Sequence, residues 1–136
     1  MALMPAVQDI VLPILKISLD GVMVTDWIPN VDHREFPFVN VRRIGGVRHE
    51  TKPMQLDKPV IEMTAYGKVG LAETETLYAD ALEALYHAVS RQTQTTAGYL
   101  HSIKETMGAT QFSSLFQDSW RVQGLIQLGV RPPRQT

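Results

Sequence analysis

The hydrophobic period of the chain changes between residues 59–66 and 71–91, and this change constrains the fold more than any other feature. In 59–66, every second residue is apolar, as in a strand with two different faces. In 71–91 the apolar positions recur at helical spacing. They are Leu77, Ala81, Leu82, Leu85, Ala88 and Val89. Gly67 and Gly70 bracket the turn between the two segments, so we expect an amphipathic helix that packs on a sheet.

Other segments carry weaker patterns of the same two kinds. They predict a helix over 5–19 with Pro13 inside it, and strands over 22–25, 36–44, 99–106 and 121–130. A polar loop is expected over 27–35. Gly45-Gly46 is expected to end the strand 36–44, followed over 47–58 by a polar loop or an irregular hairpin arm. A long loop is expected over 108–119.

The order of these segments predicts an α+β fold for a single domain of residues 1–136. We expect an antiparallel or mixed sheet of about five strands, with both helices packed on one face. The other face carries mixed residues, which suits solvent or a neighbouring subunit. Residues 131–136 contain two prolines and are expected to form an extended C-terminal tail.

Composition excludes several classes of protein. The chain has no cysteine, which excludes disulfides, thiolate metal sites and cysteine nucleophiles. A formal net charge of -1 gives no overall attraction to nucleic acid or to an anionic membrane. The N-terminus lacks a signal-peptide pattern, and the apolar run at 10–15 is too short to cross a bilayer. We expect a soluble protein, made in a cytoplasm, without membrane contact.

No motif points to catalysis. The four histidines (His33, His49, His87 and His101) are scattered, and none has the helical spacing of a zinc-ligand pair. Gly45-Gly46 is not followed by the residues of a phosphate loop, and no serine-hydrolase elbow is present. Glu73 and Glu75 are two residues apart on a helix and do not face each other. We expect no enzyme, metal or cofactor, although a site built from dispersed residues remains an alternative.

Three features are candidate contact sites for another subunit or a partner. The first is a basic run with two isolated apolar residues: Arg42, Arg43, Arg48, Lys52, Met54 and Leu56. The second is the apolar group Phe112, Leu115 and Phe116, which either folds back onto the sheet or anchors a partner. The third is the Pro-Pro tail between Arg131 and Arg134, which is either disordered or docks on a neighbour. For the basic run, a solvated sheet edge is the alternative.

The segment 36–46, Phe-Pro-Phe-Val-Asn-Val-Arg-Arg-Ile-Gly-Gly, resembles a signature of tail terminator (tail completion) proteins from actinobacterial phages with long, non-contractile tails. Segments 57–67, 79–85 and 120–128 are similar to the next elements of that family, in order. The resemblance extends from the first helix to Arg131, and the order of the motifs carries it more than any single one. The segment around Phe112 has no counterpart in it.

The resemblance implies a structural role in the virion, at the head-proximal end of the tail. Subunits would form a hexameric ring that caps the tail tube, stops its polymerisation and provides the surface that joins the tail to the head. The implied partners are other copies of the chain, the tail tube protein and the head-tail connector or head-closure protein. Genome DNA would pass through the ring without specific binding. Arg42 and Arg43 are our candidates for subunit or tube contacts, on charge density alone.

Two further functions compete with this one. A head-closure or adaptor protein of the phage neck would have a similar size and the same class of role. A nucleic-acid binding module would use the basic run that begins at Arg42, but the net charge of -1 argues against it.

Overall fold

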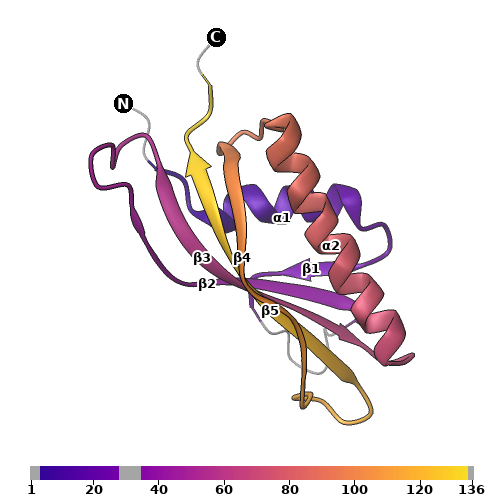
Figure 1. The fold of residues 1–136 in the computed structure, drawn as a ribbon. Coiled ribbons are helices and arrows are strands. Elements are labelled where there is room, and N and C mark those ends of the chain that lie inside the picture. Colours follow the sequence, from indigo (N-terminus) through magenta and orange to yellow (C-terminus); the bar gives the residue numbers. More distant parts are fainter. Residues whose placement is uncertain (1–3, 28–34, 135–136) are drawn as a thin grey trace.

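The computed structural model describes residues 4–27 and 35–134, and its two helices and five strands follow the predicted order (Figure 1). The elements are α1 (Val7–Ser18), β1 (Met23–Thr25), β2 (Phe38–Arg48), β3 (Asp57–Gly67), α2 (Leu71–Arg91), β4 (Tyr99–Phe112) and β5 (Trp120–Arg131). The sheet has the strand order β1-β2-β3-β5-β4. β1 is parallel to β2 and all other pairs are antiparallel, so the sheet is mixed.

Both helices pack on one face of this sheet (Figure 1). α1 buries one side, and α2 buries the apolar side that its sequence predicted. The strands contribute every second residue to the same core, among them Val39, Val41, Ile61, Met63, Ala65, Val122 and Ile126. The alternation predicted for β2, β3 and β5 is therefore confirmed, and the residues between these positions form the opposite, helix-free face.

The packing of α2 on β5 depends on Gly124. A side chain at this position would collide with the hydroxyl of Tyr78, which lies over the glycine from α2. Tyr78 is buried, and its hydroxyl has no hydrogen-bond partner among the described residues. Burial, followed by the nearby charge of Glu105, raises the pKa of Tyr78 from 10.0 to about 12.

The prediction that Gly45-Gly46 ends the strand was wrong. β2 continues through both glycines to Arg48, with a bulge between Arg43 and Gly45, and it pairs there with the start of β3. Gly46 has φ +90°, and a side chain on it would collide with the backbone of Lys58. Gly46 therefore allows the two strands to approach closely, and the segment 47–58 belongs to a hairpin arm.

The loop predicted over 108–119 was also too long, because residues 108–112 belong to a paired strand. β4 continues to Phe112 because it pairs with β5 along its length, despite three shifts in register. The loop predicted for 27–35 falls largely on 28–34, which includes His33 and lies outside the described residues, as do residues 135–136 of the tail.

Candidate assembly surfaces

The hairpin between β2 and β3 projects from the body of the protein (Figure 1). We call residues 44–60 the arm. At its turn, the backbone N–H of His49 donates to the carbonyl of Leu56 at 3.0 Å. The N–H groups of Thr51 and Lys52 donate to Nδ1 of His49, at 3.3 and 3.2 Å. The turn is thus held by its own backbone and by one histidine.

Arg43 fixes the base of the arm. Its Nη1 donates to Oδ2 of Asp57 at 2.8 Å, and its Nη2 donates to Oδ1 at 3.3 Å. Its Nε and Nη2 also donate to the carbonyls of Gly45 and Gly46, at 3.0 and 3.1 Å. These contacts hold the bulge in place. The guanidinium is therefore used within its own chain, which favours a positioning role for Arg43 over the proposed contact with a partner.

The tip of the arm, residues 47–54, carries both charge and exposed apolar surface. Val47 and Met54 are 75% and 47% exposed. Arg48 and Lys52 are exposed as well, and Nη1 of Arg48 lies 3.8 Å from Sδ of Met54. Leu56, in contrast, is buried within the monomer. Of the predicted residues in this region, the structure brings Arg48, Lys52 and Met54 to one exposed tip and leaves Leu56 inside.

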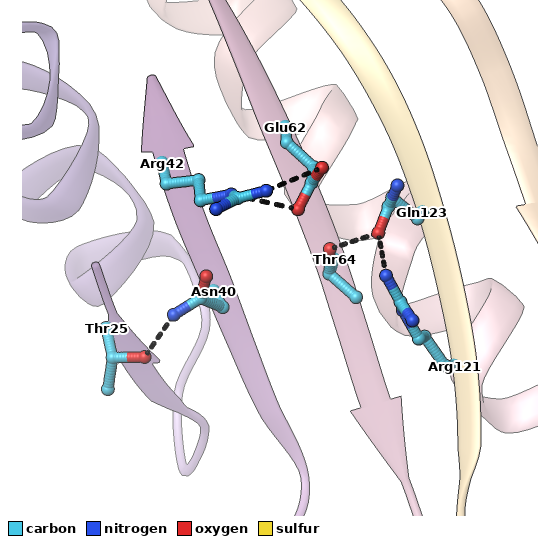
Figure 2. Close-up of polar contacts among 7 residues, drawn as sticks. All are labelled: Thr25, Asn40, Arg42, Glu62, Thr64, Arg121 and Gln123. Atoms are coloured by element: carbon cyan, nitrogen blue, oxygen red, sulfur yellow. Dashed lines mark hydrogen bonds and ion pairs between the residues drawn. The ribbon is translucent and has the colours of Figure 1, made fainter. Parts of the chain in front are cut away.

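The helix-free face of the sheet is crossed by buried polar contacts (Figure 2). Nδ2 of Asn40 donates to the hydroxyl of Thr25 at 3.1 Å. Oε1 of Gln123 accepts from the hydroxyl of Thr64 at 3.1 Å and from Nη2 of Arg121 at 2.6 Å. Amides and hydroxyls paired in this way fix the register of neighbouring strands, because a slip would leave buried polar atoms unpaired.

Arg42 lies on the same face and remains accessible. Its Nε is 3.3 Å from Oε1 of Glu62 on β3, and its side chain is 61% exposed (Figure 2). The Glu62 side chain is only 18% exposed, but the guanidinium is open to solvent, so the pair contributes little to stability, on the order of 0 to 1 kcal/mol. Exchanging Glu62 for another partner would therefore cost Arg42 little free energy. Arg43 would lose its hydrogen bonds to Asp57, Gly45 and Gly46.

Aromatic rings gather where the β4–β5 hairpin meets the start of β2. The ring of Phe116 lies 5.9 Å from Phe36, 6.0 Å from Phe38 and 5.2 Å from Tyr66, between centroids. Phe38 and Tyr66 are stacked at 4.6 Å. Phe116 thus folds back onto the helix-free face, as one of the two sequence-based alternatives expected.

The other two apolar residues of this hairpin stay at the surface. Leu115 is 62% exposed and Phe112 is 37% exposed. The guanidinium of Arg121 lies 5.4 Å from the ring centroid of Phe112, which orients that ring. We call the exposed pair Phe112 and Leu115 the hairpin tip.

The C-terminal segment docks on its own chain. The guanidinium of Arg134 lies 5.0 Å from the ring centroid of Tyr99 and donates to Oε1 of Gln92. Its backbone N–H donates to Oε1 of Gln94 at 3.4 Å. Arg131, at the end of β5, is partly buried. The described part of the tail is therefore folded against the link between α2 and β4.

Several residues at these surfaces were missed by sequence reasoning. Asp57 and Glu62 are the partners of the two arginines, and Val47 is the most exposed apolar residue of the arm. The hairpin register does not identify Asp57 as the partner of Arg43, because Asp57 stands opposite Arg48 while Arg43 stands opposite Ile61.

The structure places no metal-binding cluster and no membrane-spanning helix in residues 4–27 and 35–134. In these residues no group of three or more His, Asp or Glu side chains is placed to hold a metal ion. No helix in the same ranges is long and apolar enough to cross a membrane.

Comparisons with known proteins point to one family. A family model described as "Phage tail termination protein" matches residues 3–136. The "Gene 22 protein" of Mycobacterium phage L5 is 63% identical over 138 residues, which is 100% of this chain and 99% of the relative. The "Gene 22 protein" of Mycobacterium phage D29 is 59% identical over the same shares of both chains.

A solved structure has the same fold. One chain of the "Virion of native gene transfer agent (GTA) particle" aligns with a TM-score of 0.64, over 93% of this chain and 95% of that chain, at 16% identity. The family model covers nearly the whole chain. The protein therefore belongs to the phage tail termination protein family, as its sequence motifs had indicated, and it is a structural component of the virion tail.

Proposed function

We propose that this protein ends the tail tube by forming a hexameric ring on its head-proximal end. The ring stops the addition of further tube subunits. Its face that points away from the tube joins the tail to the head-closure protein. Genome DNA passes through the ring without sequence-specific contacts. This role needs no bond chemistry, so we assign no catalytic residue.

The observation that supports the proposal is the presence of two unlike exposed surfaces on one chain. The arm tip has Val47 and Met54 exposed beside Arg48 and Lys52, and the hairpin tip has Leu115 and Phe112 exposed. They lie at opposite ends of the sheet (Figure 1). A chain with unlike exposed surfaces can contact the next copy through one part and another protein through a different part. A head-to-tail contact between copies closes into a ring when a whole number of the rotations between neighbouring subunits makes a full turn.

A closed ring explains termination by shape. Every subunit of a ring has the same orientation, so the two faces of the ring differ. One face can match the last layer of tube subunits while the other does not match a further layer. Growth then stops because no tube-like surface remains. The exposed Arg42, whose ion pair with Glu62 is weak, is available for contact at such a face.

The length of tails made without this protein tests the proposal. In cells infected by a phage that lacks the gene, we expect tails of uncontrolled length that are not joined to heads. Supplying the wild-type chain from a plasmid should restore a single tail length and joined particles. Tails of normal length in the absence of the protein would contradict the proposal, and normal free tails that fail to join heads would favour the head-closure role.

A further inference from the structure

Two parts of the chain carry opposite charge. Residues 71–91 hold four carboxylates against one arginine, a formal charge of -3. The arm, residues 44–60, holds three basic and two acidic side chains, a formal charge of +1. The chain as a whole is at -1, so this separation is local. Charges arranged in this way attract a second copy of the same protein when the two parts face different neighbours.

The acidic part borders a groove of about 540 Å³ between the end of α1 and α2. Its lining includes the apolar residues Leu19, Val22 and Leu77. It also includes three exposed carboxylates, Asp20, Asp80 and Glu83, against one guanidinium, Arg91. The groove therefore combines apolar side chains with a net negative charge, and it suits a basic segment that also presents apolar side chains.

The arm tip is such a segment. Val47 and Met54 supply the apolar side chains, and Arg48 and Lys52 outweigh the exposed Glu50 between them, so the tip is net positive. Among the described residues, neither Arg48 nor Lys52 forms an ion pair with its own chain. The arm tip and the α1–β1 turn beside the groove lie on opposite sides of the molecule, so the arm does not reach its own groove (Figure 1).

We propose that, within the ring, the arm tip of one subunit docks in the α1–α2 groove of the next copy of the chain. This inference rests on the proposed function and specifies its subunit contact. Val47 and Met54 lie against the apolar lining, while Arg48 and Lys52 pair with Asp80 and Glu83. Each subunit gives one arm and receives one, as a closed head-to-tail ring requires.

A charge-exchange experiment tests the contact. The variants are R48E/K52E, D80K/E83K and the combination of all four changes, and ring formation on tail tubes is counted by electron microscopy against protein concentration. We expect each double variant to need about tenfold more protein, or more, for half-maximal capping. The combined variant should return close to the wild-type concentration, because the pairs are restored with their signs exchanged.

A control variant is needed to distinguish failure of the docking contact from failure of ring formation itself. K16E/K104E changes the same number of exposed charges outside the arm and the groove, and it should cap like wild type. Circular dichroism verifies that every variant is folded. Normal capping by both double variants, or loss of capping that the combined variant does not recover, would overturn the docking contact. Failure of the wild-type chain to form rings on any tube would overturn the proposed function as well.

Discussion

Arg43 reaches along the β2–β3 hairpin and binds Asp57 through two hydrogen bonds, at 2.8 and 3.3 Å, with the carboxylate side chain only 5% exposed. The same guanidinium binds the carbonyls of Gly45 and Gly46. One side chain thus closes the bulge at which the arm leaves the body of the protein, and the position of the arm depends on it.

The first prediction concerns this pair. Asp57→Asn removes the charge that faces a partly buried guanidinium, and we expect a loss of about 2 kcal/mol in the free energy of unfolding. Glu62→Gln is the matched control, because it removes the charge that faces the exposed Arg42 and should cost no more than about 0.5 kcal/mol. Urea unfolding of the two variants measures both values. Equal losses would show that Arg43 does not fix the arm.

A second prediction separates the two neighbouring arginines. Arg43→Glu places a carboxylate beside Asp57 and should disorder the arm, which hydrogen exchange of the amides in 44–60 would detect. Arg42→Glu should leave those amides protected, and it should reduce tail assembly only if Arg42 contacts a partner. An infectious phage with normal titre from the Arg42→Glu variant would exclude that contact.

A third prediction compares Phe116 with Leu115. Phe116 lies among three aromatic rings, so Phe116→Ala should lower the free energy of unfolding by about 2 kcal/mol. Leu115 is 62% exposed, and Leu115→Ala should change stability by less than about 0.5 kcal/mol. If the hairpin tip contacts a partner, Leu115→Ala should instead lower the yield of joined particles. A stable variant with an unchanged particle yield would remove Leu115 from the assembly surface.

The fourth prediction concerns the buried hydroxyl of Tyr78. This group has no hydrogen-bond partner among the described residues, so Tyr78→Phe should raise the free energy of unfolding by about 1 kcal/mol at pH 8. The pKa of Tyr78 is about 12 in the folded protein, against the ordinary tyrosine value of 10.0. Between these values the unfolded chain loses the proton first, so wild-type stability falls as the pH rises.

The Tyr78→Phe variant has no hydroxyl to lose a proton, so its stability lacks this dependence on pH. Its advantage over wild type should therefore grow by about 1 kcal/mol between pH 8 and pH 11, measured by urea unfolding at each pH. A constant difference would show that Tyr78 titrates normally, and a less stable variant would show that its hydroxyl has a partner after all.

Local patterns were sufficient to predict most of the fold. The alternation in β2 and β3 and the helical spacing in α2 follow directly from which residues face the core. The extent of the hairpins did not follow, because Gly45-Gly46 indicates a turn in isolation and becomes a strand only through its pairing with residues 59–60. Pairing partners across a hairpin depend on register, which local spacing does not specify.

The sequence predicted the chemical type of the candidate contact residues, but not which of them are exposed. The basic run indicated a charged surface, but the separation of Arg43 from Arg42 depends on a carboxylate fourteen positions along the chain. The acidic groove between α1 and α2 brings together Asp20 and Glu83, which are remote in sequence. Such a site arises from the packing of two helices and has no contiguous motif.

The most direct test of the account is electron microscopy of purified tail tube subunits polymerised with and without this protein, with a mass measurement of the protein alone. The account predicts tubes of bounded length that carry a ring of subunits at one end, whatever the state of the free protein. Tubes that grow to the same lengths in both samples, with no ring at either end, would contradict it.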